Sequence, residues 1–429
     1  MPRVRVAKPE ASDIAEDPRS FAVYKAIKAD TNDGVDVEAL NKFIQLYGGS
    51  GLAKDEAELK FKEFSELFAT QSKVTYPGEG NCVGYGAKEA GGAVEPLRFE
   101  RRATGPNDVR FQIAYAGICH SDLHQVKNDW KMGSYPMVPG HEIVGYVTEV
   151  GANVTKYKIG DAVGVGCLVN SCKTCTACTE MKEEQFCPKA IFTYAAPDVD
   201  GTSTKGGYSN FLVCDQDFVL RIPDSLPLDA SAPLLCAGIT VYSPIRHYGL
   251  DKPGMKVGVM GLGGLGHMAV KILKAMGVTV TVISTSPSKK EEALSVLGAD
   301  TFVISKNEDE MKANSNTLDG IINTISGTLE LAPYLGLLKL DGKLVYVGAP
   351  AQNPTLPVFL CLFKRITVGG SVIGGLKETQ EMLEFCGQKG VASMVEVIDA
   401  DYINTAYERM EKNDVRYRFV INVLKSITE

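Results

Sequence analysis

The clearest pattern in the chain is an alternation of short apolar segments with longer amphipathic ones, which extends from about residue 235 to residue 373. An apolar strand over 256–260 precedes a glycine-rich turn, a helix with apolar periodicity over 268–276 and a second strand over 278–283. Further strands are predicted at 320–323, 343–348 and 366–370. Strands that alternate with helices in this way predict a parallel, doubly wound sheet of the α/β class.

The turn after the first strand has the spacing Gly261-x-Gly263-x-x-Gly266, in the strand–turn–helix context that a dinucleotide-binding fold requires. The first glycine permits the tight turn, the second lets the backbone approach a pyrophosphate, and the third lets helix and strand pack closely. The phosphates would then lie at the helix N-terminus. The predicted cofactor-binding residues of this turn are Gly261, Gly263, Gly264, Leu265 and Gly266.

The second strand ends in a segment rich in serine and lysine, where a dinucleotide fold contacts the adenosine ribose. The carboxylate that would hold the 2′-hydroxyl of NAD is missing there. Hydroxyls and an ammonium group suit a 2′-phosphate instead, so the sequence predicts NADP, bound by Ser284, Thr285, Ser286 and Lys289. The alternative is that the segment is only a solvated helix cap, and the two roles can coexist.

Cys119, His141 and Cys236 supply two thiolates and one imidazole. Three such ligands leave one position of a zinc tetrahedron open, as a catalytic zinc site requires. Taken singly, each residue is better explained as a buried thiol or a core histidine, so the zinc hypothesis depends on the set. Glu142, which follows His141, either ligates zinc itself or is a buried carboxylate that supports the ligands without binding the metal.

Four further cysteines lie in one short segment rich in lysine and glutamate: Cys172, Cys175, Cys178 and Cys187. Four thiolates complete a tetrahedron and leave no position for a substrate, so we predict a closed, structural zinc site. A pair of disulfides is the alternative. The N-terminus lacks the apolar stretch of a signal peptide, however, and a reducing cytoplasmic location is expected.

Composition narrows the classes of function. With 429 residues, a hydrophobic fraction of 45% and a formal net charge of −7, the chain has the make-up of a soluble globular protein of two or three domains. The mild acidity argues against nucleic-acid binding, which favours a basic stripe. The longest apolar runs are of strand length, so no membrane-spanning segment is expected.

From about Val74 onward, the chain resembles the cinnamyl alcohol dehydrogenase family of zinc-dependent, medium-chain dehydrogenases. The resemblance rests on the motifs above and on the stretches 119–129, 135–142, 232–244, 401–409 and 411–420. It implies a GroES-like, β-rich catalytic domain (74–236 and 376–429) around a Rossmann domain (237–375), with two zinc ions per chain, NADP and a homodimer. The implied activity is the reversible reduction of aldehydes to primary alcohols, with cinnamyl-type aromatic, monocyclic or aliphatic aldehydes as substrates.

The resemblance also implies a proton relay. Ser121 would hydrogen-bond the alcohol oxygen and pass protons through the cofactor ribose to His124 at the solvent edge. Otherwise Ser121 is a helix N-cap and His124 an ordinary surface residue.

The substrate pocket is implied to contain Trp130, Met132, Phe192 and Val372, side chains that equally suit a core. Phe192 and Val372 depart from the tryptophan and phenylalanine common in the family, so the pocket is expected to be altered. Eight residues separate Cys178 from Cys187, one more than the family spacing, which affects the predicted loop geometry more than the ligation.

Residues 1–73 lie outside the resemblance. Apolar spacing near 3.6 predicts a small helical extension with helices at 21–28, 37–46 and 55–68. The acidic segment 30–38 has clustered oxygen ligands but lacks the spacing and the terminal glutamate of a calcium-binding EF-hand loop, so an acidic turn is the better explanation.

Two other function classes remain open at this point. One is a reductase of activated C=C or C=N bonds on the same scaffold, which would be expected to lose the zinc ligands or the relay, whereas this chain keeps them. The other is a non-catalytic, NADP-binding partner protein that uses the N-terminal helices to dock.

Overall fold

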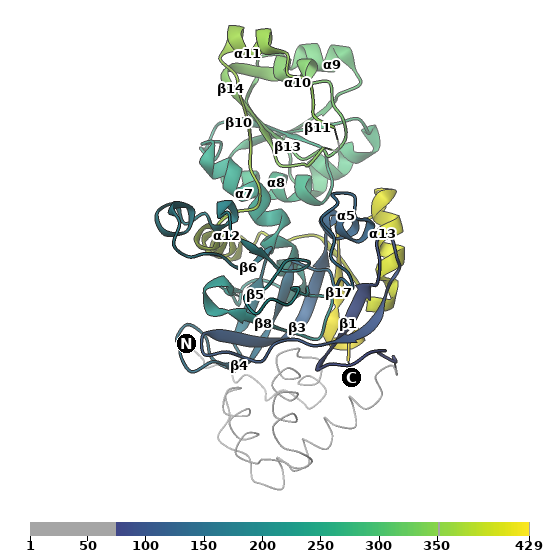
Figure 1. Ribbon diagram of the computed structural model, residues 1–429. Helices are drawn as coiled ribbons and strands as arrows, with labels where there is room; N and C mark the ends of the chain where they lie inside the picture. The colour runs from purple at the N-terminus through teal and green to yellow at the C-terminus, as the bar shows by residue number, and fades with distance from the viewer. Residues whose placement is uncertain (1–73, 351, 429) are drawn as a thin grey trace, which may run out of the picture.

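A computed structural model describes residues 74–350 and 352–428, so the helices predicted in the first 73 residues lie outside the described part. Two large β-sheets follow one another along the long axis of the molecule (Figure 1). The six-stranded sheet lies in the upper part of that view, and the seven-stranded sheet lies in the lower part. The predicted combination of a β-rich unit with a doubly wound unit is confirmed.

The lower sheet is built around the long strand β3 (Asp108–Ile118). It pairs antiparallel with β4 (Ile143–Val150), β8 (Phe211–Asp215) and β17 (Arg418–Asn422). The other strands of this sheet are β5 (Ala162–Val165), β9 (Leu220–Arg221) and β16 (Val395–Ile398). Two small sheets are formed by β1 (Cys82–Ala87) with β2 (Val94–Phe99) and by β6 (Leu168–Asn170) with β7 (Ile191–Phe192).

The upper sheet is entirely parallel. Its strands lie in the order β12 (Thr301–Ile304), β11 (Thr279–Ser284), β10 (Lys256–Met260), β13 (Leu318–Asn323), β14 (Leu338–Tyr346) and β15 (Thr367–Gly370). The chain runs outward in one direction from β10 and then in the other from β13. Doubly wound sheets bind ligands at the carboxyl ends of the strands beside this reversal. The glycine turn that follows β10 lies there.

Two predicted boundaries were wrong by four residues or more. The helix after the glycine turn, α8 (Gly264–Ala275), begins at residue 264 rather than 268, and β14 begins at residue 338 rather than 343. Apolar periodicity reveals only the residues that pack against a core. The first turn of α8 contains two glycines, and at the start of β14 a lysine, an aspartate and a glycine separate Leu338 and Leu340 from the apolar run that follows, so neither end has a continuous apolar signal.

The remaining α-helices of the described residues are α5 (His120–Lys127), α6 (Leu228–Ser231), α7 (Ala237–His247), α9 (Glu308–Ala313), α10 (Ala332–Leu337), α11 (Val358–Lys364), α12 (Leu376–Lys389), α13 (Ile403–Glu411) and α14 (Val423–Ser426). Within residues 74–350 and 352–428, no single helix has both the length and the apolarity to cross a membrane. One bent pair, Leu228–Leu235 with Ala237–His247, meets that test on length and composition alone.

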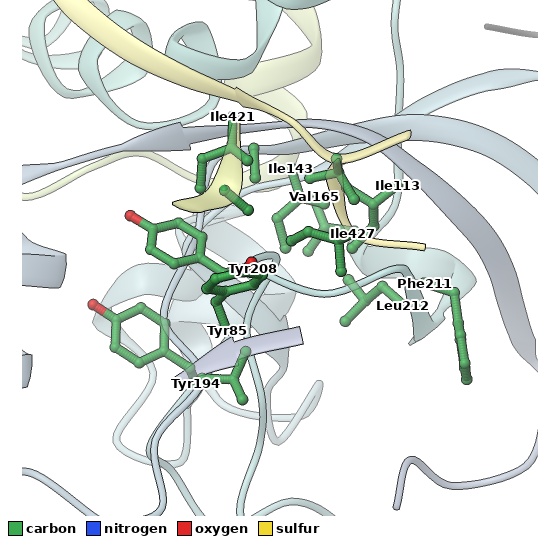
Figure 2. Close-up of a cluster of buried hydrophobic side chains, with 14 of the residues drawn as sticks. Tyr85, Ile113, Ile143, Val165, Tyr194, Tyr208, Phe211, Leu212, Ile421 and Ile427 are labelled. Carbon is green, nitrogen blue, oxygen red and sulfur yellow. The ribbon is translucent and has the colours of Figure 1, made fainter. Parts of the chain in front are cut away.

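The core of the lower sheet contains side chains from widely separated parts of the chain. In Figure 2, Tyr85 and Ile113 lie in one cluster with Ile421 and Ile427, and all four are buried. The C-terminal residues therefore complete the core that the first strands begin. The division into residues 74–236 with 376–429 and residues 237–375 stays a prediction.

A second core joins the two halves of the molecule. It combines the upper strands with α7 and α12 and includes Leu220 and Ile222, which belong to the lower part. Because Cys236 is the N-cap of α7, this shared core fixes the position of that cysteine relative to both sheets.

Candidate active site

The ligands predicted for a catalytic zinc ion converge from three separate elements. Cys119 follows β3 and is the N-cap of α5, His141 precedes β4, and Cys236 is the N-cap of α7. Their ligand atoms and one carboxylate oxygen of Glu142 all lie within 4.8 Å of one another. Cys119 Sγ lies 4.0 Å from Cys236 Sγ, and His141 Nε2 lies 3.2 Å from Cys236 Sγ. Tetrahedral zinc with Zn–S bonds of about 2.3 Å holds its sulfur ligands roughly 3.8 Å apart, so the donor set fits zinc.

Asp122, in the first turn of α5, orients two of these ligands and is fully buried. Its Oδ2 accepts the Cys119 backbone N–H at 2.9 Å and the Tyr208 hydroxyl at 3.2 Å. Its Oδ1 lies 3.1 Å from His141 Nδ1 and accepts the Gly140 N–H at 3.1 Å. A carboxylate on Nδ1 keeps the proton on that nitrogen and leaves the lone pair of Nε2 for a metal.

Glu142 forms a buried ion pair with Arg418, the first residue of β17. Arg418 Nη2 donates to Glu142 Oε1, whereas Glu142 Oε2 has no hydrogen-bond partner. Burial raises the pKa of Glu142 to about 7, and the opposing charge of Arg418 limits that rise. One carboxylate oxygen is thus held by the arginine while the other stays unpaired. Whether Glu142 ligates zinc stays a prediction.

The two relay residues lie one helical turn apart on α5. Ser121 Oγ is 3.7 Å from Cys119 Sγ, beside the metal ligands. His124 is partly exposed, and its Nδ1 lies 2.8 Å from Asp129 Oδ2. The N-cap of α5 is Cys119 rather than Ser121, so the alternative in which Ser121 caps the helix is wrong. The relay itself stays a prediction.

The four residues predicted for the substrate pocket are exposed rather than packed in a core. Trp130 is 39% exposed and its ring centroid lies 5.1 Å from that of His124. Met132 is 63% exposed, Phe192 on β7 is 52% exposed, and Val372, just beyond β15, is 51% exposed. The interpretation of these side chains as core residues is therefore wrong, and their contact with substrate stays a prediction.

The second cysteine group forms a compact cluster of its own. The sulfur atoms of Cys172, Cys175, Cys178 and Cys187 lie within 4.8 Å of one another. Cys175 Sγ is 3.6 Å from Cys178 Sγ, and Cys187 Sγ is 3.4 Å from Cys172 Sγ. A disulfide needs about 2.05 Å, and all of these cysteines are free thiols, so the disulfide alternative is wrong. Four sulfurs at these separations fit a closed structural zinc site.

The glycine turn has the shape that a bound pyrophosphate needs. Gly261 has φ +86°, a left-handed conformation that favours glycine. A Cβ at Gly266 would lie 2.2 Å from the Gly261 carbonyl oxygen, and a Cβ at Gly264 would lie 2.8 Å from Arg418 Nη1. Gly263 and Leu265 flank these positions at the start of α8. Arg418 therefore lies between the N-terminus of α8 and Glu142, and it links the cofactor turn to the zinc ligands.

The residues predicted to contact the 2′-phosphate lie at the end of β11 and in the segment that follows it. Ser284 is buried and its Oγ accepts the Ser286 N–H at 3.2 Å, while Thr285 is exposed. Lys289 Nζ donates to the Leu262 carbonyl at 2.8 Å, across the glycine turn. Ser286 is the N-cap of the short turn Pro287–Lys289 but makes no capping hydrogen bond with its side chain, which leaves its hydroxyl available.

Comparison with known proteins agrees with this geometry. Residues 105–224 match the alcohol dehydrogenase GroES-like domain family, and residues 264–388 match the zinc-binding dehydrogenase family. The chain is 59% identical to cinnamyl alcohol dehydrogenase 8 of Arabidopsis thaliana over 81% of this chain and 96% of that protein. It is 61% identical to mannitol dehydrogenase of Petroselinum crispum over 78% of this chain and 99% of that protein. The chain belongs to the cinnamyl alcohol dehydrogenase family.

This alcohol dehydrogenase also resembles a solved structure that contains the cofactor. A cinnamyl alcohol dehydrogenase from Helicobacter pylori, crystallised with NADP(H), is 44% identical and has a TM-score of 0.75 over 81% of this chain and 99% of that one. The prediction of NADP as cofactor is confirmed by this NADP(H) complex of a family member. The predictions of a structural and a catalytic zinc site are confirmed by the zinc-binding dehydrogenase match and by the two ligand clusters. The assignment of single residues to parts of the cofactor stays a prediction.

Two residues of the dehydrogenase site were not predicted from its sequence. Asp122 had a detectable signal, since it stands three residues after Cys119, where a side chain can reach back to the N-cap of a helix. The signal for Arg418 was weaker: it is a charged residue at the start of an otherwise apolar strand, and a buried arginine needs a partner of opposite charge.

Proposed function

We propose that this member of the family is an NADP-dependent alcohol dehydrogenase that interconverts apolar aldehydes and primary alcohols. The observation that carries the proposal is the three-ligand group Cys119, His141 and Cys236, with the hydroxyl of Ser121 only 3.7 Å from a ligand sulfur. Three ligands leave one zinc position for a substrate oxygen. When bound, zinc supplies an electrophile for the carbonyl oxygen, and the nicotinamide supplies or accepts a hydride.

The chain's own residues would deliver the proton that the substrate oxygen needs. In reduction, NADPH, a proton and an aldehyde give NADP⁺ and an alcohol, so one proton must reach the substrate oxygen. Ser121 donates it and is reprotonated along the path to His124, whose partly exposed ring exchanges protons with water. Asp129 holds the orientation of that ring through Nδ1. Oxidation of an alcohol runs along the same path in reverse.

The preference for NADP over NAD is supported by the polar groups at the end of β11 and just beyond it. Hydroxyls of Ser284, Thr285 and Ser286 and the ammonium of Lys289 stand where an NAD site would have a carboxylate. A 2′-phosphate has about two negative charges, which a carboxylate would repel and these groups would bind.

The substrate class is supported by the exposed apolar side chains of Trp130, Met132 and Phe192. The relatives divide between a protein named for cinnamyl alcohol and one named for mannitol, at nearly equal identity. Apolar and aromatic side chains favour an aromatic or aliphatic aldehyde over a sugar, because a sugar needs several polar partners for its hydroxyls.

The test is NADPH oxidation by the purified protein with cinnamaldehyde, benzaldehyde, a short aliphatic aldehyde and mannose, with NADH in parallel and Cys119→Ala as the inactive control. We expect turnover that prefers NADPH, ranks cinnamaldehyde or benzaldehyde above mannose and disappears in the variant. Faster turnover with mannose would contradict the substrate class. No turnover with any of these compounds would direct the search to C=C or C=N substrates.

We also propose a homodimer formed through the top of the upper sheet. The outer edge of β15 has no strand partner among the described residues, and the adjacent helix α11 exposes apolar side chains. Phe359, Leu362 and Phe363 are 75%, 67% and 82% exposed. An open strand edge beside such a patch is the kind of surface that a second copy covers.

A cytoplasmic location is proposed as well. All eleven cysteines of the chain are free thiols, which suits a reducing compartment.

A further inference from the structure

The segment that leads into β17, Arg416-Tyr417-Arg418, runs along the cofactor-binding side of α8. The Tyr417 ring stacks on His267 of α8, with centroids 4.7 Å apart and planes 8° apart. Arg418 lies against the N-terminus of α8, as described above. Arg416 is half-exposed, and neither the zinc ligands nor the relay uses it.

Arg416 reaches the short helical segment that follows β11. Its Nε lies 3.0 Å from Glu292 Oε2, and its backbone N–H donates to Glu396 Oε1 at 3.0 Å, which anchors this end of the segment. Glu292 stands only three residues after Lys289. Burial lowers the pKa of Lys289, and the positive charge of Arg416 lowers it further, which reflects the proximity of the two cations.

We propose that Arg416 is a second recognition residue for the 2′-phosphate of NADP and acts together with Lys289. The inference rests on the proposed NADP preference and extends it to a residue from the other half of the molecule.

The charges around this position favour the assignment. Glu292 is the acidic partner of Arg416 and lies three residues after Lys289, which itself follows the end of β11 by five residues. Both cations therefore belong to the surroundings of the strand end at which a dinucleotide fold contacts the adenosine ribose. The Arg416 side chain is 49% exposed, and an ion pair of such a solvated arginine contributes little to stability, so the arginine can share Glu292 with a phosphate at little cost. A guanidinium can donate two parallel hydrogen bonds to a phosphate, which a lysine cannot. NAD has no phosphate at this position, and with NAD the arginine stays on Glu292.

The experiment measures binding of NADPH and NADH to the zinc-loaded protein by nicotinamide fluorescence, so it needs no turnover. Arg416→Gln removes the charge, and Arg416→Lys keeps the charge without the paired donors. Arg246→Gln is the matched control, because Arg246 is similarly exposed and pairs with a single carboxylate, Asp251, at the end of α7 far from Cys236.

We expect Arg416→Gln to raise the Kd for NADPH about tenfold, the loss that corresponds to one charge-assisted hydrogen bond, with little change for NADH. Arg416→Lys should fall between wild type and Arg416→Gln, and Arg246→Gln should match wild type. Glu292→Gln frees Arg416 from its carboxylate and should leave NADPH binding equal or tighter.

An unchanged ratio of the NADPH and NADH affinities in Arg416→Gln would overturn the inference while the NADP preference stands. Weaker NADPH binding in Glu292→Gln would also overturn it, and that variant decides the question if Arg416→Gln folds poorly. A wild-type protein that binds NADH as tightly as NADPH would overturn both the inference and the proposed NADP preference.

Discussion

Ser121 is the residue on which the proposed proton transfer depends most directly. Its hydroxyl lies beside Cys119, while the ligands around it are held by the independent contacts of Asp122. Removing the hydroxyl should therefore affect proton transfer without affecting metal binding.

Ser121→Ala is expected to lower kcat by about 100-fold or more, the usual contribution of general acid–base catalysis, with zinc content and NADPH affinity unchanged. The measurement is steady-state kinetics with cinnamaldehyde, with the metal counted in the same preparation. Ser134→Ala, at an exposed serine, serves as the control. Wild-type kcat in Ser121→Ala would exclude the serine from the relay.

At the scale of residues, sequence was informative where residue type itself determines the chemistry. Cysteine and histidine are typical zinc ligands, and the motifs around Cys119 and Gly261 could be recognised without coordinates. Asp122 had a local signal toward Cys119, but its contact with His141 and the ion pair of Arg418 with Glu142 join separate segments. No local pattern encodes such a pairing.

Helix α8 has a buried histidine at its cofactor end. His267 Nδ1 lies 3.3 Å from the Gly263 carbonyl oxygen, and its Nε2 accepts the Met394 N–H at 3.3 Å, so the ring ties α8 to the segment before β16. Burial, assisted by the charge of Arg418, lowers the pKa of His267 to about 3, from an ordinary value of 6.5.

This lowered pKa predicts acid sensitivity. Below pH 6.5 this histidine is protonated in the unfolded chain, whereas in the folded protein it stays neutral down to about pH 3. The free energy of unfolding therefore falls as the pH decreases through that window, by roughly 1.4 kcal/mol per pH unit. Between pH 7.5 and 5.5 the wild type should thus lose about 1.4 kcal/mol more than His267→Gln. Urea unfolding of both proteins at the two pH values measures the difference, and equal losses would contradict the lowered pKa.

The cysteine-rich lobe is a second element with a separable role. Its Glu184 accepts the backbone N–H of Leu376 at 3.0 Å, so the lobe contacts the start of α12. Lys173 also pairs with Asp215 and Asp217, which fastens the lobe to the end of β8.

Cys187→Ser should reduce the zinc content from about two ions per chain to about one and lower the Tm by several degrees, because one metal-ligand set is broken. Metal analysis and a thermal scan provide the measurement. Cys361→Ser, at a cysteine outside both clusters, should retain both ions. A variant that keeps two ions would show that the lobe does not hold zinc.

Helices and strands could be predicted from the sequence where apolar residues extend over their whole length. Strands β10, β11 and β13 lie close to their predicted positions, because they are buried on both faces. The start of α8 was missed, since its first turn, which is predicted to face the cofactor, has glycines at two of its first three positions. At these positions the glycines stand where apolar residues that pack against the core would have marked the helix.

The molecule as a whole is expected to pair through α11 and β15. The rings of Phe359 and Phe363 stack with centroids 6.4 Å apart, and both side chains are exposed to solvent. A charged side chain at either position should therefore prevent a second copy from packing against them. Phe359→Asp combined with Phe363→Asp should convert a particle of twice the chain mass of 46.2 kDa into one of 46.2 kDa.

Light scattering after size-exclusion chromatography measures that change. Val199→Asp, at an exposed valine in the lower part, should leave the assembly intact. A wild-type particle of single chain mass would contradict the proposed homodimer.

The order of the strands also constrains how the enzyme is made. The upper sheet is complete within residues 256–370, and it can form as soon as that stretch leaves the ribosome. The lower sheet begins much earlier, yet β3 must wait for β17, where Ile421 pairs with Ala116 across some 300 residues of chain. During synthesis the half that holds most zinc ligands therefore stays open longest, with its thiols accessible to the cell's zinc supply until the last residues arrive.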